Sequence, residues 1–410
     1  MSYPQLFVGI DVSKLKHDVV IVNEHKKVIH KPLVIPESRE GYHHLLAKLD
    51  GLKHKHGTET FYFGMEATGD YWKNLYHFLT QQSPAFVTTV LNPIQTRAFA
   101  QTELRRAKTD PINAKDIALF MAEKRPKPFV TRGPIFEAIK DLDRQIYQIK
   151  KQQTMMKNKL RLELAKVAPE IEQAFKQLGG SQVLALLEKF PTAEALAKTS
   201  LEELCRVRYG KGKWALPQGF AEKMKALATH SIAHKTGAGA GDVVQSLVRR
   251  ILACQQETAL LKQQLVTLYQ QVNEQDSLLT TIKGITKETA IVLEAYIGDV
   301  HRFSDAKKLV AYFGMNPVVN LSGKKTKRTS FLEKKGSGIV RHKLFMAILQ
   351  IVRLKEGPIY AYYARLTTQD KPKPKLLAIG AAMRKLLVII YAMLKNQQPF
   401  NPEHIIPENK

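Results

Sequence analysis

The sequence Phe7-Val-Gly-Ile-Asp-Val12 has the alternation of a β-strand. Successive side chains of a strand point to opposite faces of a sheet, so this stretch separates into two faces. One face carries Phe7, Gly9 and Asp11, and the other carries Val8, Ile10 and Val12. The pattern therefore predicts a strand that closes on an acidic residue, Asp11.

Further strands and helices are predicted between this strand and Pro134. The β-like runs are 18–22, 28–34, 60–65 and 86–91, and the helical patterns are 39–49, 71–79 and 112–122. Pro111 stands where the first turn of a helix tolerates proline. Alternating strands and helices predict a mixed α/β domain over residues 1–130.

Two heptad patterns follow this domain. Apolar residues recur every three, four or seven positions from Ile135 to Leu160, and every three or four from Val244 to Val272. This spacing predicts long helices that pair as a coiled coil, either with each other or across subunits. We expect a coiled-coil region over 135–277, with a small helical insert at about 179–241, which includes a turn at Gly210-Lys-Gly-Lys213.

The last part of the chain, 278–410, predicts a mainly helical domain. Short helices are expected around Gly284, Gly298 and Gly314, and an apolar helix at Leu376–Leu394 is expected to dock onto the core. Between them, the segment from Gly323 to Lys343 holds eight Lys or Arg and one acid, Glu333. Such a segment is either a solvated surface or a contact with phosphate.

The charge of the whole chain narrows the class of protein. The 410 residues contain 63 Lys and Arg against 37 Asp and Glu, a formal charge of +26. A folded protein with this excess typically meets a polyanion such as nucleic acid. No apolar run is long enough to predict a membrane span, no export signal precedes the first strand, and only Cys205 and Cys254 are present, so we expect a cytoplasmic protein.

Three acids are candidates for a metal site. Asp11 and Glu66 follow apolar strands, and Asp110 begins a helix. Carboxylates brought together from distant parts of a chain are ligands suited to Mg²⁺. Each acid alone is more simply a turn, strand-end or cap residue; the three together favour metal binding.

Eight motifs occur in an order that resembles a known family. They are Gly9-Ile-Asp-Val-Ser-Lys14, Met65-Glu-Ala-Thr-Gly69 with Tyr71, Leu91-Asn-Pro93, Lys108-Thr-Asp110, Ile282-Lys-Gly-Ile-Thr286, Tyr296-Ile-Gly-Asp299 with Arg302-Phe303, Ala311-Tyr-Phe-Gly314 with Pro317, and Ser322-Gly323. This order is similar to that of the DEDD transposases of insertion sequences, which include Piv-type DNA invertases and bridge-RNA-guided recombinases.

The resemblance implies a fold and an activity. The fold is an RNase H-like (RuvC-like) N-terminal domain, a coiled-coil region and a C-terminal transposase domain. The implied activity is the cutting and rejoining of donor and target DNA, with a non-coding guide RNA as partner. The matching residues place Mg²⁺ at Asp11, Glu66 and Asp110, and a nucleophilic hydroxyl at Ser322.

Two departures from the family pattern affect this site. The fourth acid of the family falls on Asn113, and Asp116, one turn further along the predicted helix, is a substitute ligand. A second departure is Glu333, where the family usually has a serine before Lys334. Because no general base is near Ser322 in the sequence, its activation requires acids or metal from the other domain, which implies a homo-oligomer, either a dimer or a tetramer.

The basic residues near the motifs are candidates for phosphate contacts. They are Lys324, Lys325, Lys327, Arg328, Lys334, Lys335 and Arg341 around the serine, and Arg105, Arg106 and Lys108 before Asp110. Three alternatives remain beside a recombinase. They are a RuvC-like nuclease that activates water, a nucleic-acid-binding protein with a decayed site, and a sugar-kinase or actin-like ATPase, which the charge disfavours.

Overall fold

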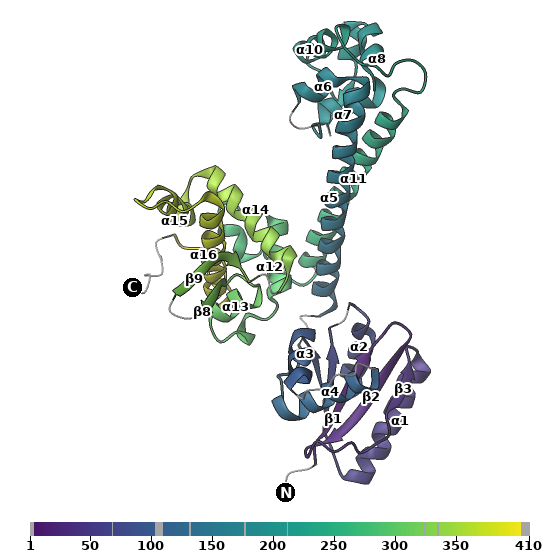
Figure 1. Cartoon of the computed structure of the whole chain (residues 1–410), viewed down its shortest axis with the longest axis vertical. Coiled ribbons are helices and arrows are strands. Elements are labelled where there is room, and N and C mark those ends of the chain that lie inside the picture. Colours follow the sequence, from purple (N-terminus) through teal and green to yellow (C-terminus); the bar gives the residue numbers. More distant parts are fainter. Residues whose placement is uncertain are drawn as a thin grey trace. The chain divides into compact units, whose positions relative to one another are not determined.

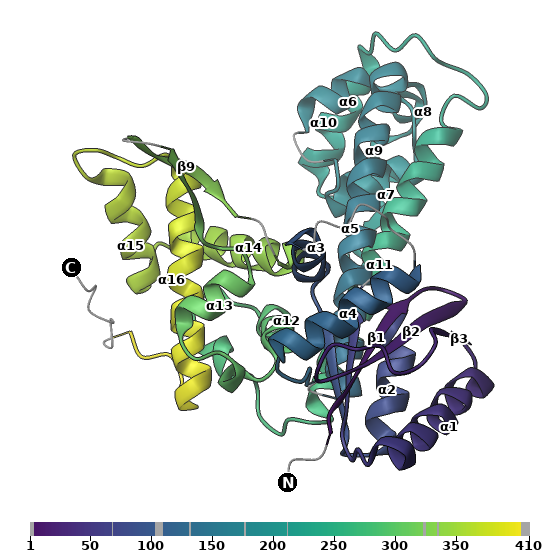
Figure 2. The same cartoon turned by 60° about the horizontal axis from the view of Figure 1, so that its bottom comes forward.

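A computed structural model describes residues 4–67, 69–102, 110–130, 133–175, 178–210, 212–322, 325–333 and 336–402, with the backbone alone at 102, 110–111, 318–322 and 325–331. The chain divides into two compact units, Met1–Val130 and Thr131–Lys410. The first unit is a sheet covered by helices, and the second is almost entirely helical (Figures 1 and 2).

Five strands form the sheet of the first unit, in the order β3-β2-β1-β4-β5. They are β1 (Leu6–Val12), β2 (Lys16–Asn23), β3 (Leu33–Pro36), β4 (Phe61–Glu66) and β5 (Phe86–Leu91). β1, β2 and β3 are antiparallel neighbours, whereas β1, β4 and β5 run parallel. The predicted mixed α/β class is therefore correct for this part of the chain.

Helices cover both faces of this sheet. They are α1 (Arg39–His56), α2 (Trp72–Gln82), α3 (Pro93–Thr102) and α4 (Asp110–Lys124). Val8 and Ile10 of β1 pack with apolar residues of α1 and α2, while Phe7 packs with those of α4. The two faces predicted for the first strand thus meet two different helix layers.

One predicted strand, 28–34, is placed wrongly. The chain turns at Asn23, whose side chain accepts hydrogen bonds from the backbone of His25 and Lys27. Val28 then makes only an isolated bridge to Val22, and the regular strand begins at Leu33. Pro32 has no N–H to donate to a sheet, so pairing resumes only after it.

The second unit begins with two long helices that pair with each other. They are α5 (Pro134–Val167) and α11 (Asp242–Gln270). Ile139 of α5 shares a core with Leu265 of α11, and Leu160 shares another with Val244, so the helices are antiparallel. Several residues of the two heptad patterns lie in these shared cores, although Val272 at the end of the second pattern is 47% exposed.

The insert between these helices contains five helices and a very short hairpin. They are α6 (Pro169–Ala174), α7 (Ser181–Lys189), α8 (Ala193–Lys198), α9 (Leu201–Cys205), β6 (Arg208–Tyr209), β7 (Trp214–Ala215) and α10 (Gln218–Thr229). The apolar side chains of the insert share one core with the adjoining ends of α5 and α11. The sequence predicted the helices but not the hairpin.

The remainder of the second unit is helical around one hairpin. Its elements are η1 (Leu278–Thr281), α12 (Lys287–Ile297), η2 (Val300–Arg302), α13 (Ala306–Tyr312), β8 (Pro317–Ser322), β9 (Lys325–Leu332), α14 (Gly338–Leu354), α15 (Gly357–Thr368) and α16 (Lys375–Asn396). α16 is the predicted docking helix, and Leu386, Leu387 and Ile390 are fully buried in the core. By length and composition, α16 is the one described helix that is apolar enough to cross a membrane.

A buried ion pair links this part to α5. Asp143 of α5 is fully buried, and its Oδ1 lies 2.5 Å from Nζ of Lys343 on α14. Tyr147 of α5 also meets the ring of His342 edge-on. Burial and the negative charge of Asp143 raise the pKa of Tyr296 on α12. Lys343, although it belongs to the basic segment, is thus engaged by an acid.

Candidate active site at the strand ends

Two acidic residues end neighbouring parallel strands of the first unit. Ile10 of β1 lies opposite Met65 of β4, so the residues that follow them, Asp11 and Glu66, come next in the same register. Both lie on the face of α4, because the alternation that buries Ile10 and Met65 on the opposite face turns them there. The sheet therefore brings together two carboxylates that are 55 positions apart in the sequence.

Two glycines let α4 approach this face closely. A Cβ added at Gly9 would lie 2.1 Å from the carbonyl oxygen of Ala114, and one at Gly64 would lie 2.4 Å from Cγ of Met121. Any larger residue at Gly9 would push the helix backbone away from the strand. Glycine in a strand interior is a sign of such close approach.

This close packing places Asn113 beside Asp11. Nδ2 of Asn113 donates a hydrogen bond of 3.1 Å to Oδ2 of Asp11. Asp110 is the first residue of α4, and its side chain lies outside the described residues. Asp116, one turn after Asn113, is 7% exposed.

Glu66 is held by the next helix. The hydroxyl of Thr96, on α3, donates a hydrogen bond to Oε1 of Glu66 and another, of 3.2 Å, to the carbonyl of Pro93. α3 begins here because Asn92 accepts a hydrogen bond of 2.9 Å from the backbone of Ile94, as an N-cap residue does. The predicted motif Leu91-Asn-Pro93 thus joins β5 to the helix that contacts Glu66.

The donor set at the strand ends fits a hard divalent cation. Carboxylate oxygens are the ligands that such ions prefer, and Asp11 and Glu66 supply them from rigid strand ends. Among the described side chains, no three of the His, Cys, Asp and Glu type come together as a metal site. Asp116 therefore does not form such a group with Asp11 and Glu66.

Ser322 and its basic neighbours belong to the second unit. Ser322 is the last residue of β8 and pairs with Lys325 at the start of β9. Lys327 and Arg328 also lie in β9, opposite Asn320 and Val319; only the backbone of these residues is described. Lys324, Lys334, Lys335, Arg105, Arg106 and Lys108 lie outside the described residues.

Arg341 has partners within its own unit. Its Nη1 donates hydrogen bonds of 3.1 Å to the carbonyl oxygens of Phe313 and Gly336. Burial lowers the pKa of this guanidinium, although arginine stays charged at neutral pH. Arg341 therefore secures the chain that enters α14, and its predicted contact with phosphate stays a prediction.

Sequence reasoning missed Thr96 and the role of the glycines. Nothing about Thr96 marks it in the sequence, because its contact with Glu66 spans 30 positions and depends on the path of α3. Gly9 and Gly64 did carry a signal, since both interrupt otherwise apolar strands. Each glycine stands two residues before an acid of the site.

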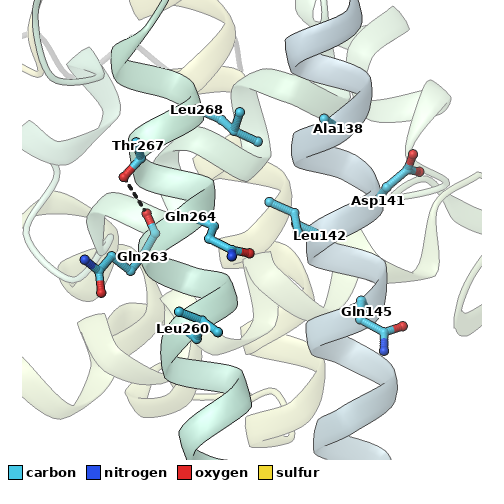
Figure 3. A pocket seen from close by; sticks show the side chains of 9 residues that line it. All are labelled: Ala138, Asp141, Leu142, Gln145, Leu260, Gln263, Gln264, Thr267 and Leu268. Carbon is cyan, nitrogen blue, oxygen red and sulfur yellow. Dashed lines mark hydrogen bonds between the residues drawn. The ribbon is translucent and has the colours of Figure 1, made fainter.

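A surface pocket lies elsewhere, between α5 and α11 (Figure 3). It has a volume of about 660 Å³ and is lined by Ala138, Asp141, Leu142, Gln145, Leu260, Gln263, Gln264, Thr267 and Leu268. Its one acid, Asp141, is paired with Arg144 on the same helix. Leucines and glutamines give this pocket no nucleophile or metal site, so it is not a candidate for the reaction.

Two transposase family models match this chain. A DEDD transposase model of the IS110 type matches residues 8–169, and a transposase model of the IS116/IS110/IS902 family matches residues 276–364. Together they cover more than half of the chain. The first match includes Asp11, Glu66, Asp110 and Asn113, and the second includes Ser322.

Similar proteins align over almost the whole length. The pilin gene-inverting proteins of Moraxella bovis and Moraxella lacunata are each 25% identical, over 96% of this chain and 97% of theirs. An insertion element IS110 protein of Streptomyces coelicolor is 23% identical, over 95% of this chain and 94% of its own. The chain belongs to the IS110/IS116/IS902 family of insertion-sequence transposases, enzymes that cut and rejoin DNA.

Proposed function

We propose that this transposase holds Mg²⁺ at the strand ends of an RNase H-like domain and cuts DNA with Ser322, guided by a structured non-coding RNA. The observation that carries the proposal is the pair of carboxylates on β1 and β4, with Asn113 against Asp11 and Thr96 against Glu66. A divalent cation bound there supplies charge stabilisation to a phosphodiester whose bonds are changing.

Each residue of the site has a proposed task. Asp11 and Glu66 bind the cation, and Asp110, at the start of the helix that carries Asn113, provides a third carboxylate. Asn113 replaces a charged ligand by an amide and thereby weakens the site. Asp116 is the substitute ligand only if α4 shifts, because its carboxylate does not join Asp11 and Glu66 in the described arrangement.

Ser322 is the proposed nucleophile. Its hydroxyl gives up a proton, its oxygen forms a bond to phosphorus, and the bond from phosphorus to one deoxyribose oxygen breaks. The released sugar oxygen takes up a proton, and the reverse step joins a new end. Because Ser322 and the carboxylates belong to different units of the chain, the units must act together in the nucleoprotein assembly.

The proposed partners are nucleic acids. Lys325, Lys327 and Arg328 follow Ser322 in one hairpin and would neutralise phosphates beside the reacting bond. Relatives named for inverting a pilin gene support an exchange between two DNA sites. In RNA-guided exchange, base pairing reads the sequence and the protein senses backbone and shape.

A homo-oligomer is also proposed. The groove between α5 and α11 exposes leucines, of which Leu260 is 50% exposed. A second helix pair from another copy would cover them, as in a four-helix bundle. Light scattering of the purified protein checks this, and Leu260→Glu should shift the mass toward the monomer while Ile232→Glu, on the insert, should not.

Strand transfer in a purified system tests the serine mechanism. The full protein is incubated with DNA of its element, the flanking non-coding RNA and Mg²⁺, and junction products are counted. Ser322→Ala should abolish products, and Ser330→Ala in the same hairpin should not. Asp11→Asn and Glu66→Gln should each lower the yield at least a hundredfold.

Two other outcomes would identify the alternatives. Hydrolysed and unjoined ends that persist in Ser322→Ala would identify a nuclease that activates water. Asn113 at the place of an acid favours a decayed site. In that case, the wild-type protein and the Asn113→Asp variant both bind nucleic acid, and neither yields a product. Paired variants Asp110→Asn and Asp116→Asn identify the third carboxylate, since only the true ligand should raise the Mg²⁺ requirement.

A further inference from the structure

The hairpin in the insert is strongly basic. β6 and β7 pair Arg208 with Ala215 and Tyr209 with Trp214, and Lys213 closes the turn by donating its backbone N–H to Gly210 at 3.3 Å. From Leu204 to Pro217 the chain contains four Lys or Arg and no Asp or Glu. These are Arg206, Arg208, Lys211 and Lys213, of which Lys211 lies outside the described residues.

A tryptophan lies exposed on this hairpin. Trp214 is 59% exposed, although large aromatic side chains are usually buried. Its ring lies over the turn, since a Cβ at Gly210 would be 2.8 Å from Cζ3 and one at Gly212 would be 2.6 Å from Cε2. Tyr209 supports the ring from the paired strand, with centroids 5.9 Å apart. The indole is therefore held in place while more than half of its surface meets solvent.

Two cations of this hairpin make no ion pair with an acid among the described residues. Arg206 is engaged by Glu202 at 2.5 Å, whereas Arg208 and Lys213 are exposed and make no ion pair within the part of the chain that the structure describes. Like charges on one short hairpin repel one another, and a bound polyanion removes this repulsion.

We infer that this hairpin binds unpaired nucleotides of a nucleic acid. A base stacks on Trp214, and the phosphates on either side of that base contact Arg208 and Lys213. Stacking on an aromatic side chain needs a base that has left its duplex. The inference uses neither the carboxylates nor Ser322, so it can fail or succeed independently of the proposed reaction.

Tryptophan fluorescence tests this contact in the full protein. The chain has two tryptophans, and the other, Trp72, is buried at 9% exposure, so Trp72→Phe leaves Trp214 as the only reporter. Titration with a uridine 12-mer, a thymidine 12-mer and a duplex DNA of equal length should give saturable quenching with the single strands alone. Quenching by the uridine 12-mer alone identifies RNA as the ligand, and quenching by the thymidine 12-mer alone identifies displaced DNA.

Affinity measurements complete the test. By anisotropy of the labelled strand, Trp214→Ala should weaken binding about fivefold or more, and Trp214→Phe should retain most of it. Arg208→Gln and Lys213→Gln should each reduce the slope of log affinity against log salt by about 0.7. Lys189→Gln and Ile232→Ala, exposed elsewhere on the insert, serve as matched controls.

Three results would overturn the inference. They are no quenching by either single strand, equal quenching by duplex DNA, and single-strand affinity unchanged in a Trp214→Ala protein whose circular dichroism is native. Loss of strand transfer in Ser322→Ala with unchanged quenching would separate the two proposals.

Discussion

The side-chain amide of Asn113 donates a 3.1 Å hydrogen bond to Asp11 across 102 positions of sequence. The contact joins the end of β1 to the first turns of α4, at the place where the proposed metal site needs negative charge. An amide satisfies the carboxylate of Asp11 in the absence of metal, which an acid would not do. Asn113 therefore stabilises the metal-free fold and weakens the proposed metal site together.

Asn113→Asp should destabilise the metal-free fold and strengthen the proposed metal site. Two carboxylates in contact repel, so the melting temperature without metal should fall by a few degrees, corresponding to about 1–2 kcal/mol. Added Mg²⁺ should reverse the loss, and differential scanning calorimetry with and without Mg²⁺ measures both. Asn74→Asp is a matched control, because Asn74 donates a similar 2.9 Å bond to Glu37, which is not one of the proposed metal ligands. An equal melting temperature of Asn113→Asp with and without Mg²⁺ would contradict the proposed metal site.

Gly9→Ala should destabilise the first unit severely. Its Cβ would meet the backbone of Ala114 at 2.1 Å, and backbone atoms cannot swing aside as a flexible side chain does. We expect a loss of about 3 kcal/mol or more in urea unfolding. Gly51→Ala, in the open middle of α1, should instead stabilise by about 0.5–1 kcal/mol. Equal effects of the two substitutions would refute the close packing of α4.

Glu37 should stabilise the fold at neutral pH and lose this effect in acid. Burial would raise its pKa, but hydrogen bonds from Tyr42, Asn74 and His17 outweigh this and hold the pKa below its ordinary value of 4.5. A carboxyl group whose pKa is lower in the folded state stabilises the fold at pH values above its pKa in the unfolded state. This stabilisation is lost as the pH falls through its pKa in the folded state.

Denaturation at several pH values measures this contribution. At pH 7, Glu37→Gln should cost about 1 kcal/mol, since solvent partly screens the carboxylate. The difference from wild type should shrink between about pH 5 and pH 3. Glu59→Gln controls for the loss of an exposed charge. A difference that stays constant down to pH 3 would rule out this network as its cause.

Lys343→Gln should destabilise the second unit. The variant leaves the fully buried Asp143 without its cation, which typically costs about 3–5 kcal/mol. Asp143→Leu combined with Lys343→Met should recover most of this loss, because an apolar pair needs no compensation. Lys283→Gln, which removes an exposed pair with Glu356, should leave the urea midpoint unchanged. Similar midpoints for Lys343→Gln and Lys283→Gln would argue against a structural role for the buried pair.

Regular patterns in the sequence were sufficient to predict most elements. Alternation over Phe7–Val12 and heptads from Ile135 and Val244 report which side chains are buried, and burial is what forms these elements. The strand at 28–34 was placed wrongly because Val28 makes only an isolated bridge and Pro32 has no N–H to donate, so regular pairing begins at Leu33. The hairpin β6–β7 was missed because each strand has only two residues, and β8–β9 because β9 is basic and lacks an apolar alternation.

By itself, the sequence determined the class of the chain, its long helix pair and the acids worth testing, because each depends on local periodicity or on motifs in order. Only the tertiary structure decided which residues meet. Asn113 contacts Asp11 because Gly9 lets α4 pack closely on β1. Thr96 on α3 contacts Glu66. Lys343 of the basic segment pairs with Asp143. Such contacts follow from the packing of elements far apart in the chain, a relation that no local pattern records.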